Sequence, residues 1–197
     1  MEQTVGLRER KKRRTRETLI RIAGDLFAKK GFEATTVDEI AEKADVSRST
    51  FFRYFPTKEM VAFPHQTAHS TKFFSLLSKS RSGESPMDTV RRACMEMSKL
   101  FMRDREAHLE QWRIIQASPT LVSRGDKFDE EWEEMIYETL VQGHTENAPA
   151  VFRSKVFAGA IFGVIKTLLR EWYIGDCRDN LQVMTKESLA LLDFKIE

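Results

Sequence analysis

The sequence has few cysteines and no long uninterrupted apolar run. Its two cysteines, Cys94 and Cys177, are far apart and fit no metal-ligand or redox spacing, which excludes a disulfide framework and a Cys-based zinc motif. The longest apolar stretch, Val156 to Ile165, is well short of the roughly 20 residues that a membrane-spanning helix needs. We therefore expect free thiols, no transmembrane segment and a cytoplasmic location.

Neither sign of charge dominates, since 32 Lys and Arg face 30 Asp and Glu, and 41% of the residues are hydrophobic. This balance excludes the apolar-poor, highly charged composition of a disordered chain. Glycine is sparse, with 9 residues, and extended alternation of apolar and polar residues is missing, which favours an all-α chain. Because a glycine-rich phosphate loop and a nucleophile elbow are also missing, the sequence indicates no enzyme.

The near-neutral total hides an asymmetry along the chain. Residues 1–60 contain 14 Lys and Arg and 10 Asp and Glu, a net charge of +4, whereas residues 61–197 contain 18 and 20, a net charge of −2. Seven bases fall within residues 8–16, and seven acids fall within residues 126–138. A polyanion would therefore approach the amino-terminal part. We expect residues 1–14 to form a basic, flexible arm.

Apolar residues of the amino-terminal part repeat at helical spacing. The stripe of an amphipathic helix consists of Leu19, Ile22, Ala23, Leu26 and Phe27. Gly31 can end this helix, and Thr36-Val-Asp-Glu39 has the pattern of a capping box, which predicts a second helix. Ser47 predicts the N-cap of a third, short helix from Arg48 to Phe55, which Pro56 ends.

Two helices joined by a tight turn, the second one short, are the pattern of a helix-turn-helix unit. The first residues of the second helix would enter the major groove of DNA, where an arginine donates to guanine and hydroxyl groups reach base edges. These candidates are Arg48, Ser49 and Thr50. Phosphate contacts are expected from Thr36, Ser47, Tyr54 and Lys58. Phe51 and Phe55 would anchor the short helix on the first one. Small capped helices are common, so this spacing alone leaves DNA binding and a purely structural role both open.

A specific residue pattern extends from position 31 to position 59. It comprises Gly31-Phe32, Thr35-Thr36-Val37, Ile40-Ala41, Ala44, Val46-Ser47, Thr50-Phe51-Phe52-Arg53-Tyr54-Phe55 and Lys58-Glu59. With these residues the chain closely resembles the amino-terminal domain of TetR/AcrR-family bacterial transcriptional regulators, over about residues 13–62. Its total length and its helical remainder also agree with that family.

The resemblance implies a homodimer that places two helix-turn-helix units in successive major grooves of a palindromic double-stranded operator, usually as a repressor. The family's base-reading positions fall on Arg48, Ser49, Thr50 and Arg53, and its phosphate-contacting positions on Thr36, Ser47, Tyr54 and Lys58. The sequence departs from the family at Asp45, Ser49 and Phe52, where glycine, glycine and tyrosine are common. Because Phe52 has no phenol to meet a phosphate, core packing and a thymine-methyl contact remain alternatives for it.

The remainder is predicted to be a larger helical domain of residues 61–197, following a DNA-binding domain of residues 1–60. Helices are expected at 57–78, 86–103, 104–117, 126–142, 150–173 and 181–194, about nine in total, with Pro64 kinking or interrupting the first of these six. In the family this domain binds a small molecule and dimerises.

Aromatic residues of this domain suggest a pocket for a small hydrophobic effector, although such stripes are more often core. The predicted walls and polar anchors are Phe101, Trp112, Arg113, Gln116, Trp132 and Tyr137. Residues 150–172 are apolar on nearly all sides and contain small residues, so they need burial on every side. A dimer interface is predicted at Gly159, Phe162, Gly163 and Leu189, and the alternative is the central core helix of a monomer.

Two histidines and one cysteine suggest other chemistry only weakly. His65 and His69 have the i, i+4 spacing of a metal pair, but no third ligand is obvious, so we expect no metal and no cofactor. Cys94 lies among apolar neighbours and is interpreted as inert core. The sequence therefore predicts a dimeric, ligand-responsive DNA-binding regulator, most simply a repressor that a hydrophobic effector releases. The alternative is an all-α small-molecule-binding or catalytic protein with a vestigial helix-turn-helix.

Overall fold

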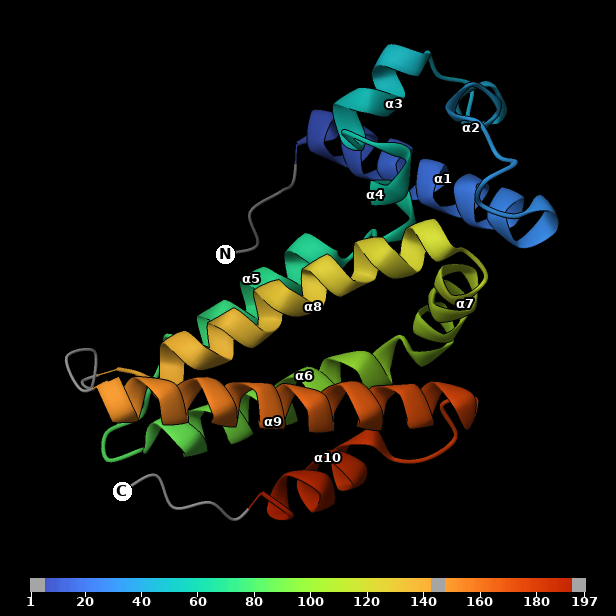
Figure 1. Cartoon of the computed structure of the whole chain (residues 1–197). Coiled ribbons are helices and arrows are strands. Elements are labelled where there is room, and N and C mark those ends of the chain that lie inside the picture. Colours follow the sequence, from blue (N-terminus) through green and yellow to red (C-terminus); the bar gives the residue numbers. More distant parts are fainter. Residues whose placement is uncertain (1–5, 143–147, 193–197) are drawn as a thin grey trace. The chain divides into compact units, whose positions relative to one another are not determined.

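The computed structural model describes residues 6–142 and 148–192, and these residues form ten α-helices and no strand (Figure 1). The helices are α1 (Leu7–Lys30), α2 (Val37–Lys43), α3 (Arg48–Tyr54), α4 (Lys58–Ala62), α5 (Gln66–Leu77), α6 (Pro86–Arg103), α7 (Arg105–Gln116), α8 (Pro119–Leu140), α9 (Ala148–Ile174) and α10 (Leu181–Ala190). The predicted all-α class is confirmed. The expected nine helices become ten because the chain is interrupted at Pro64, which separates α4 from α5.

The chain divides into two compact units. Unit 1 comprises Met1–Pro64 and Gln111–Gly125, and unit 2 comprises His65–Glu110 and Asp126–Glu197. The four helices α1 to α4 therefore belong to unit 1, together with residues 111–125, which the sequence did not associate with them. The division into a DNA-binding domain of residues 1–60 and a second domain of residues 61–197 stays a prediction.

The apolar stripe of α1 forms the centre of unit 1. Its five residues are all buried, as the periodicity predicts: Leu19, Ile22, Ala23, Leu26 and Phe27. Gly31 ends the helix at a φ of 86°, a conformation that glycine adopts without steric cost, and its amide donates to the oxygen of Phe27 at 2.9 Å. Phe32 then folds back, so that its ring centroid lies 5.2 Å from that of Phe27.

The start of α1 corrects the sequence analysis. The helix begins at Leu7, so a flexible arm separate from the first helix is wrong for residues 7–14, and residues 1–5 lie outside the described part. This segment is rich in Lys and Arg, which have good helix propensity but leave no apolar stripe for a periodicity search to detect.

The start of α8 is a second correction. Residues 118–126 were expected to separate two helices, but α8 already begins at Pro119. The Ser118 hydroxyl accepts a hydrogen bond from the Leu121 amide at 3.2 Å, and Pro119 occupies the first turn. Both are ordinary signals of a helix start, so Ser118 begins the helix rather than breaking it.

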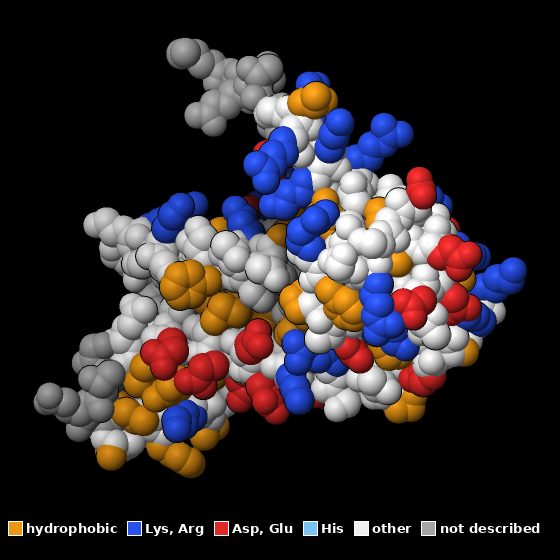
Figure 2. All heavy atoms as spheres, turned by 90° about the horizontal axis from the view of Figure 1, so that it is seen from above, with side chains coloured by type: hydrophobic (Ala, Val, Ile, Leu, Met, Phe, Trp, Pro, Cys, Tyr) orange, Lys and Arg blue, Asp and Glu red, His pale blue; other side chains and the backbone are white. Residues whose placement is uncertain are grey.

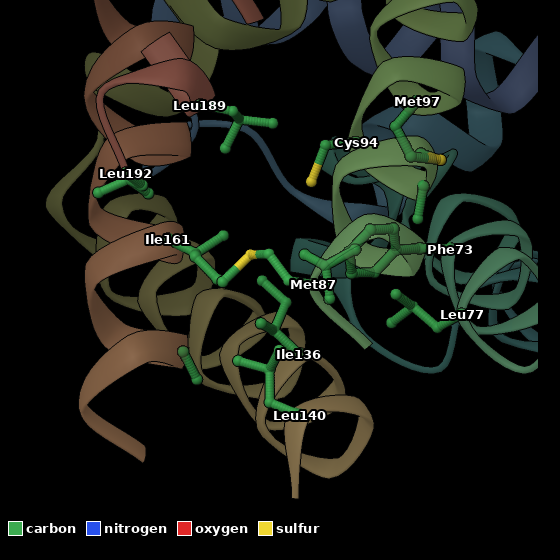
Figure 3. Close-up of a cluster of buried hydrophobic side chains, with 13 residues drawn as sticks. Phe73, Leu77, Met87, Cys94, Met97, Ile136, Leu140, Ile161, Leu189 and Leu192 are labelled. Carbon is green, nitrogen blue, oxygen red and sulfur yellow. The ribbon is translucent and has the colours of Figure 1, made fainter. Parts of the chain in front are cut away.

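Unit 2 is built around a cluster of buried apolar side chains from five helices (Figure 3). The helices α5, α6, α8, α9 and α10 contribute Phe73, Val90, Ile136, Ile161 and Leu189, respectively. A second cluster contains Trp172, whose indole nitrogen donates to the oxygen of Asp179 at 3.0 Å, and the buried Cys177. Burial in the first cluster also raises the pKa of the Cys94 thiol to about 12, which supports its interpretation as inert core.

The helix α9 has two different apolar faces. Ala158, Ile161, Leu168 and Trp172 are buried in the clusters of unit 2. The opposite face carries exposed apolar residues at helical spacing, with Phe152 at 68%, Val156 at 53% and Ile174 at 58% exposure, and the exposed Gly163 between them. We call Phe152, Val156, Gly159, Gly163 and Ile174 the outward face of α9.

This composition makes α9 the one helix in residues 6–142 and 148–192 that is long and apolar enough to cross a membrane, with a mean hydropathy of 1.4 over 18 residues. The uninterrupted apolar run in the sequence ends before Lys166, so its length alone did not indicate such a helix. Because four of its side chains complete the core of unit 2, its position here is that of a core helix.

The predicted dimer interface needs one correction within unit 2. Leu189 is only 4% exposed and lies in the buried cluster, so it is a core residue of the single chain. Phe162 packs partly against the same cluster. Gly159 and Gly163 are the predicted interface residues that lie on the outward face of α9, and an added Cβ would meet no atom within 4 Å at Gly163.

Three imidazole rings meet at the beginning of α5 and in α7. His69 lies 5.7 Å from His65 and 5.3 Å from His108 between ring centroids, and His108 stacks on Phe101 at 4.4 Å with an angle of 5°. The sequence pairs His65 with His69 but gives no sign of His108, which is 39 or more positions away. In the part of the chain that the structure describes, no group of three or more His, Cys, Asp or Glu residues could hold a metal ion.

We expect His108 to make the protein sensitive to acid. Burial is the main cause that lowers the pKa of His108 from 6.5 to about 4, and the charges of His69 and His65 act in the same direction. Between these values the unfolded chain takes up a proton that the folded chain does not, so stability is lost as the pH falls from about 6.5 toward 4, by up to ~3 kcal/mol. Urea unfolding of the wild type and of His108→Phe at several pH values measures this loss. The variant keeps a ring against Phe101 and should show a flatter profile.

His65→Gln is the control for this prediction, because it removes an exposed imidazole and leaves the burial of His108, the main cause of its lowered pKa, unchanged. Its pH profile should follow that of the wild type more closely. Equal acid sensitivity of the wild type and His108→Phe would show that His108 does not control the stability in this range.

Candidate DNA-binding surface

The helices α2 and α3 form the predicted helix-turn-helix, joined by a turn at Asp45. Asp45 has a φ of 53°, a left-handed conformation that aspartate tolerates better than most residues with a Cβ. The amide of Val46 donates to the oxygen of Ala41 at 3.0 Å across this turn. Asp45 thus adopts the backbone conformation for which glycine is the usual residue, and the departure from the family pattern leaves the turn intact.

The capping box at the start of α2 is confirmed. The Thr36 hydroxyl accepts from the Glu39 amide at 3.2 Å, and a Glu39 carboxylate oxygen accepts from the Thr36 amide at 2.8 Å. The hydrogen bond from Lys30 is the main cause that lowers the pKa of Glu39 to about 2, followed by the bond from the Thr36 amide. These contacts fix the amino terminus of α2, where Thr36 is an exposed candidate for a phosphate contact.

The helix α3 has a buried face and an exposed face. Phe51 is fully buried and Phe55 is 3% exposed, as expected for residues that anchor the helix, and the guanidinium carbon of Arg16 from α1 lies 5.2 Å from the Phe55 ring centroid. Phe52 is 37% exposed, so core packing is the wrong alternative for this residue. Its ring meets that of Phe51 edge to face at 5.5 Å, and the guanidinium carbon of Arg48, one helical turn earlier, lies 5.6 Å from its centroid.

Three hydroxyl groups are bonded together at the start of α3. The Ser47 hydroxyl oxygen accepts from the Thr50 amide at 3.1 Å, as an N-cap does, and lies 2.9 Å from the Ser49 hydroxyl oxygen and 3.0 Å from that of Thr50. Ser47 and Ser49 are exposed, and Thr50 is half-buried. The structure therefore places the predicted hydroxyl candidates on one small surface.

Arg48 is held by a residue that the sequence analysis did not single out. Its Nη1 atom donates to both carboxylate oxygens of Asp38 in α2, at 3.0 and 2.8 Å, and its guanidinium carbon lies 5.6 Å from the Phe52 ring centroid. The two charged side chains are 62% and 65% exposed. An ion pair this exposed contributes only about 0–1 kcal/mol to stability, so its main effect is on where the arginine lies.

The remaining candidates differ in their surroundings. Arg53 is exposed, with its guanidinium carbon 5.6 Å from the ring centroid of the half-buried Tyr54. Lys58, by contrast, points its Nζ at the backbone, where it donates to the oxygens of Phe32 at 2.8 Å and Thr35 at 2.9 Å. Lys58 thus fastens the loop between α1 and α2, a structural role that sequence spacing did not indicate. Its replacement would disturb this loop as well as any phosphate contact.

The charges of the surface are unevenly spread. Figure 2 shows Lys and Arg side chains gathered in one part of the visible face, and Asp and Glu side chains mainly in others. The exposed bases in the first two turns of α1 are Arg8, Arg10, Lys11, Lys12, Arg13 and Arg14. Such a group attracts a phosphate backbone without distinguishing its sequence.

The predicted ligand residues fall into both compact units. Phe101, Trp132 and Tyr137 are half-buried in unit 2, and Trp132 stacks on Phe73 at 4.8 Å as part of the core packing. Trp112, Arg113 and Gln116 belong to unit 1. A cavity of about 330 Å³ in unit 2 is lined by other residues, namely Arg105, Glu106, Leu109, Asp176, Cys177 and Arg178. The ligand site stays a prediction.

Comparisons with known proteins agree with this geometry. A family model for bacterial regulatory proteins of the tetR family matches residues 19–62, and a model for the MftR C-terminal domain matches residues 84–195. The HTH-type transcriptional regulator TcmR of Streptomyces glaucescens is 32% identical over 175 residues, which cover 86% of this chain and 77% of TcmR. The transcriptional regulator MftR of Mycobacterium tuberculosis is 25% identical over 172 residues, which cover 87% of this chain and 84% of MftR.

A solved structure shares the fold. It is that of FadR from Thermus thermophilus, a TetR-family transcriptional repressor in complex with lauroyl-CoA. The TM-score is 0.55 at 23% identity, and the match covers 90% of this chain and 92% of that one. At this identity the similarity establishes the common fold and leaves the ligand open.

Proposed function

The chain belongs to the TetR family of bacterial DNA-binding transcriptional regulators, and from this premise we propose that it is a cytoplasmic, homodimeric repressor of a palindromic operator. The observation that carries the proposal is the start of α3, where Arg48 and Ser49 are exposed to solvent while Phe51 of the same helix is fully buried. A short helix fixed on one side and polar on the other fits the major groove.

Each predicted contact has a definite part in this proposal. Arg48 and Arg53 donate to base edges, and Ser49 and Thr50 add hydroxyl groups. Ser47, Thr36 and Tyr54 supply donors to phosphates at the ends of the two helices. The basic residues of α1 add a salt-dependent attraction to any DNA sequence. Phe52, exposed beside Arg48, supplies an apolar surface for a thymine methyl group.

The outward face of α9 supports the homodimer. An apolar helix face with Phe152, Val156 and Ile174 more than half exposed is unfavourable in water and is typical of an interaction surface. A second copy of the chain covers it in the proposal, with Gly159 and Gly163 allowing close approach. A two-fold contact also presents two α3 helices to half-sites about 34 Å apart.

The proposed effector is a small hydrophobic molecule. This proposal is supported by the aromatic residues that the sequence predicts as pocket walls. The effector binds within residues 61–197 and favours a conformation in which the two α3 helices no longer match the spacing of adjacent major grooves. Pro64, the last residue of unit 1, interrupts the chain between α4 and α5 and is the proposed pivot. Release of promoter DNA during a gel-shift titration with hydrophobic compounds checks this direction, and tighter binding would contradict it.

Arg48→Ala tests the DNA-binding surface. We expect this variant to bind the promoter region upstream of its own gene about 1–3 kcal/mol more weakly than the wild type, because a bidentate contact to guanine is lost. Fluorescence anisotropy at several salt concentrations gives the affinity for this fragment and for a non-specific duplex. The affinity for the non-specific duplex should change much less.

Arg103→Ala, an exposed arginine at the end of α6 in unit 2, is the matched control and should bind both duplexes like the wild type. Unchanged promoter binding by Arg48→Ala, with wild-type circular dichroism, would contradict its role in reading DNA. Failure of the wild type itself to prefer the promoter would favour a small-molecule-binding protein with a vestigial helix-turn-helix.

A further inference from the structure

The proposed DNA contacts give no reason for an acidic residue at Asp38 in the helix-turn-helix. It is an exposed carboxylate in the first turn of α2, on a surface proposed to approach a polyanion. A carboxylate there repels phosphates and weakens binding to every DNA sequence. Its contact with Arg48 can offset this cost by improving the recognition of a base. We propose that Asp38 is a positioning residue, which orients Arg48 to read guanine and thereby sets sequence specificity. This inference rests on the proposed function.

The atoms of the ion pair determine which part of Arg48 remains available. Both Asp38 oxygens accept from the same nitrogen, Nη1, at 3.0 and 2.8 Å. A guanidinium group carries five N–H donors in a planar fork, so the edge formed by Nε and Nη2 keeps two parallel donors. Two parallel donors are what O6 and N7 of guanine accept from an arginine in the major groove.

A second contact limits where the guanidinium group of Arg48 can lie. Its carbon lies 5.6 Å from the ring centroid of Phe52, one helical turn further along α3, and this ring is itself set edge to face against the buried Phe51. Arg48 is therefore supported from α2 by a carboxylate and from α3 by an aromatic ring. The side chain of Arg48 nevertheless remains 62% exposed.

Orientation before binding changes specificity more than it changes affinity. A free arginine side chain has many rotamers and can follow any phosphate, whereas an arginine already held in one orientation loses less entropy when it meets guanine. The negative charge of Asp38 meanwhile penalises DNA that offers no compensating base contact. Removal of Asp38 should therefore strengthen non-specific binding and reduce discrimination at one base pair.

The experiment uses DNA selected by the wild-type chain from a random duplex library. Affinities are then measured for the selected site, for the same site with each G·C pair replaced by A·T in turn, and for an unrelated duplex. We expect the wild type to discriminate about tenfold to hundredfold at one symmetric G·C position, and Arg48→Ala to lose this discrimination. Asp38→Ala should reduce it about fivefold or more while binding the unrelated duplex more tightly, and Asp38→Asn, which keeps an acceptor oxygen, should retain part of it.

Glu42→Ala is the matched control, because it removes an equal charge from an exposed position on α2. It should raise the affinity for all DNA as Asp38→Ala does, without changing discrimination at the G·C position. Full discrimination by Asp38→Ala, or the same loss in Glu42→Ala, overturns the positioning role. If the wild type selects no sequence at all, the proposed function fails and the inference fails with it; if it selects one that Arg48 and Asp38 do not affect, only the inference fails.

Discussion

Gly163→Glu should dissociate the proposed dimer into monomers and lower the affinity for promoter DNA at least about a hundredfold. Gly163 lies in the middle of the outward face of α9, and the proposed two-fold contact would bury one added carboxylate from each copy. An uncompensated buried charge costs about 3–5 kcal/mol, which corresponds to a hundredfold or more in a dissociation constant. The change is well suited to the test because a Cβ at Gly163 meets no atom of its own chain within 4 Å.

Sedimentation equilibrium and a gel shift on promoter DNA measure the two effects, with circular dichroism as the check of folding. Thr71→Glu, which adds the same charge at an exposed position of α5 in unit 2, should remain dimeric and bind DNA like the wild type. Gly159 is a poorer site, since an added Cβ would lie 3.4 Å from a carboxylate oxygen of Glu133. A Gly163→Glu variant that sediments as a dimer would show that the outward face of α9 does not form the interface.

Phe51→Ala should have the largest effect on folding and should separate DNA binding from dimerisation. Phe51 is fully buried, and its ring lies 5.5 Å from that of Phe52 and 5.8 Å from that of Phe55. Removal of a fully buried phenyl group costs about 3–5 kcal/mol, a large part of the stability of a small unit. We expect unit 1 to unfold at a much lower urea concentration and DNA binding to be lost, while unit 2 keeps its helices.

Urea titrations followed by circular dichroism measure this effect, and sedimentation shows whether the dimer persists. The neighbouring Phe52→Ala is the control, because its ring is 37% exposed and its removal should cost about 1 kcal/mol or less. Similar unfolding midpoints for the two variants would contradict the anchoring role of Phe51.

The sequence was most informative where a single local interaction determines the structure. The capping box of Thr36 and Glu39, the stripe of α1 and the interruption at Pro64 were all predicted, because each depends on residues within one or two helical turns. The starts of α1 and α8 were placed too late. In α1 the first turns are basic and lack an apolar face, and the expected start of α8 at residue 126 overlooks the N-cap signal of Ser118.

The candidate site was predictable as a set of residues but not as a set of contacts. Resemblance to a family supplied Arg48 and its neighbours, whereas the bonds of Arg48 to Asp38 and of Lys58 to Phe32 join residues 10 and 26 positions apart. No local pattern reports such a pairing, because it depends on how two helices pack. The same reason applies to His108, which meets His69 only in the folded unit.

The bonds of α4 determine how a signal would reach the DNA. Lys58 of α4 holds the loop before α2 through the oxygens of Phe32 and Thr35, and Arg16 of α1 donates to the oxygen of Pro64, just beyond α4. Because of these bonds, we expect a displacement of Pro64 to move α1, α2 and α4 together as a rigid body. Mutations that alter the response to an effector and mutations that alter which bases are read should then fall into two separate genetic classes.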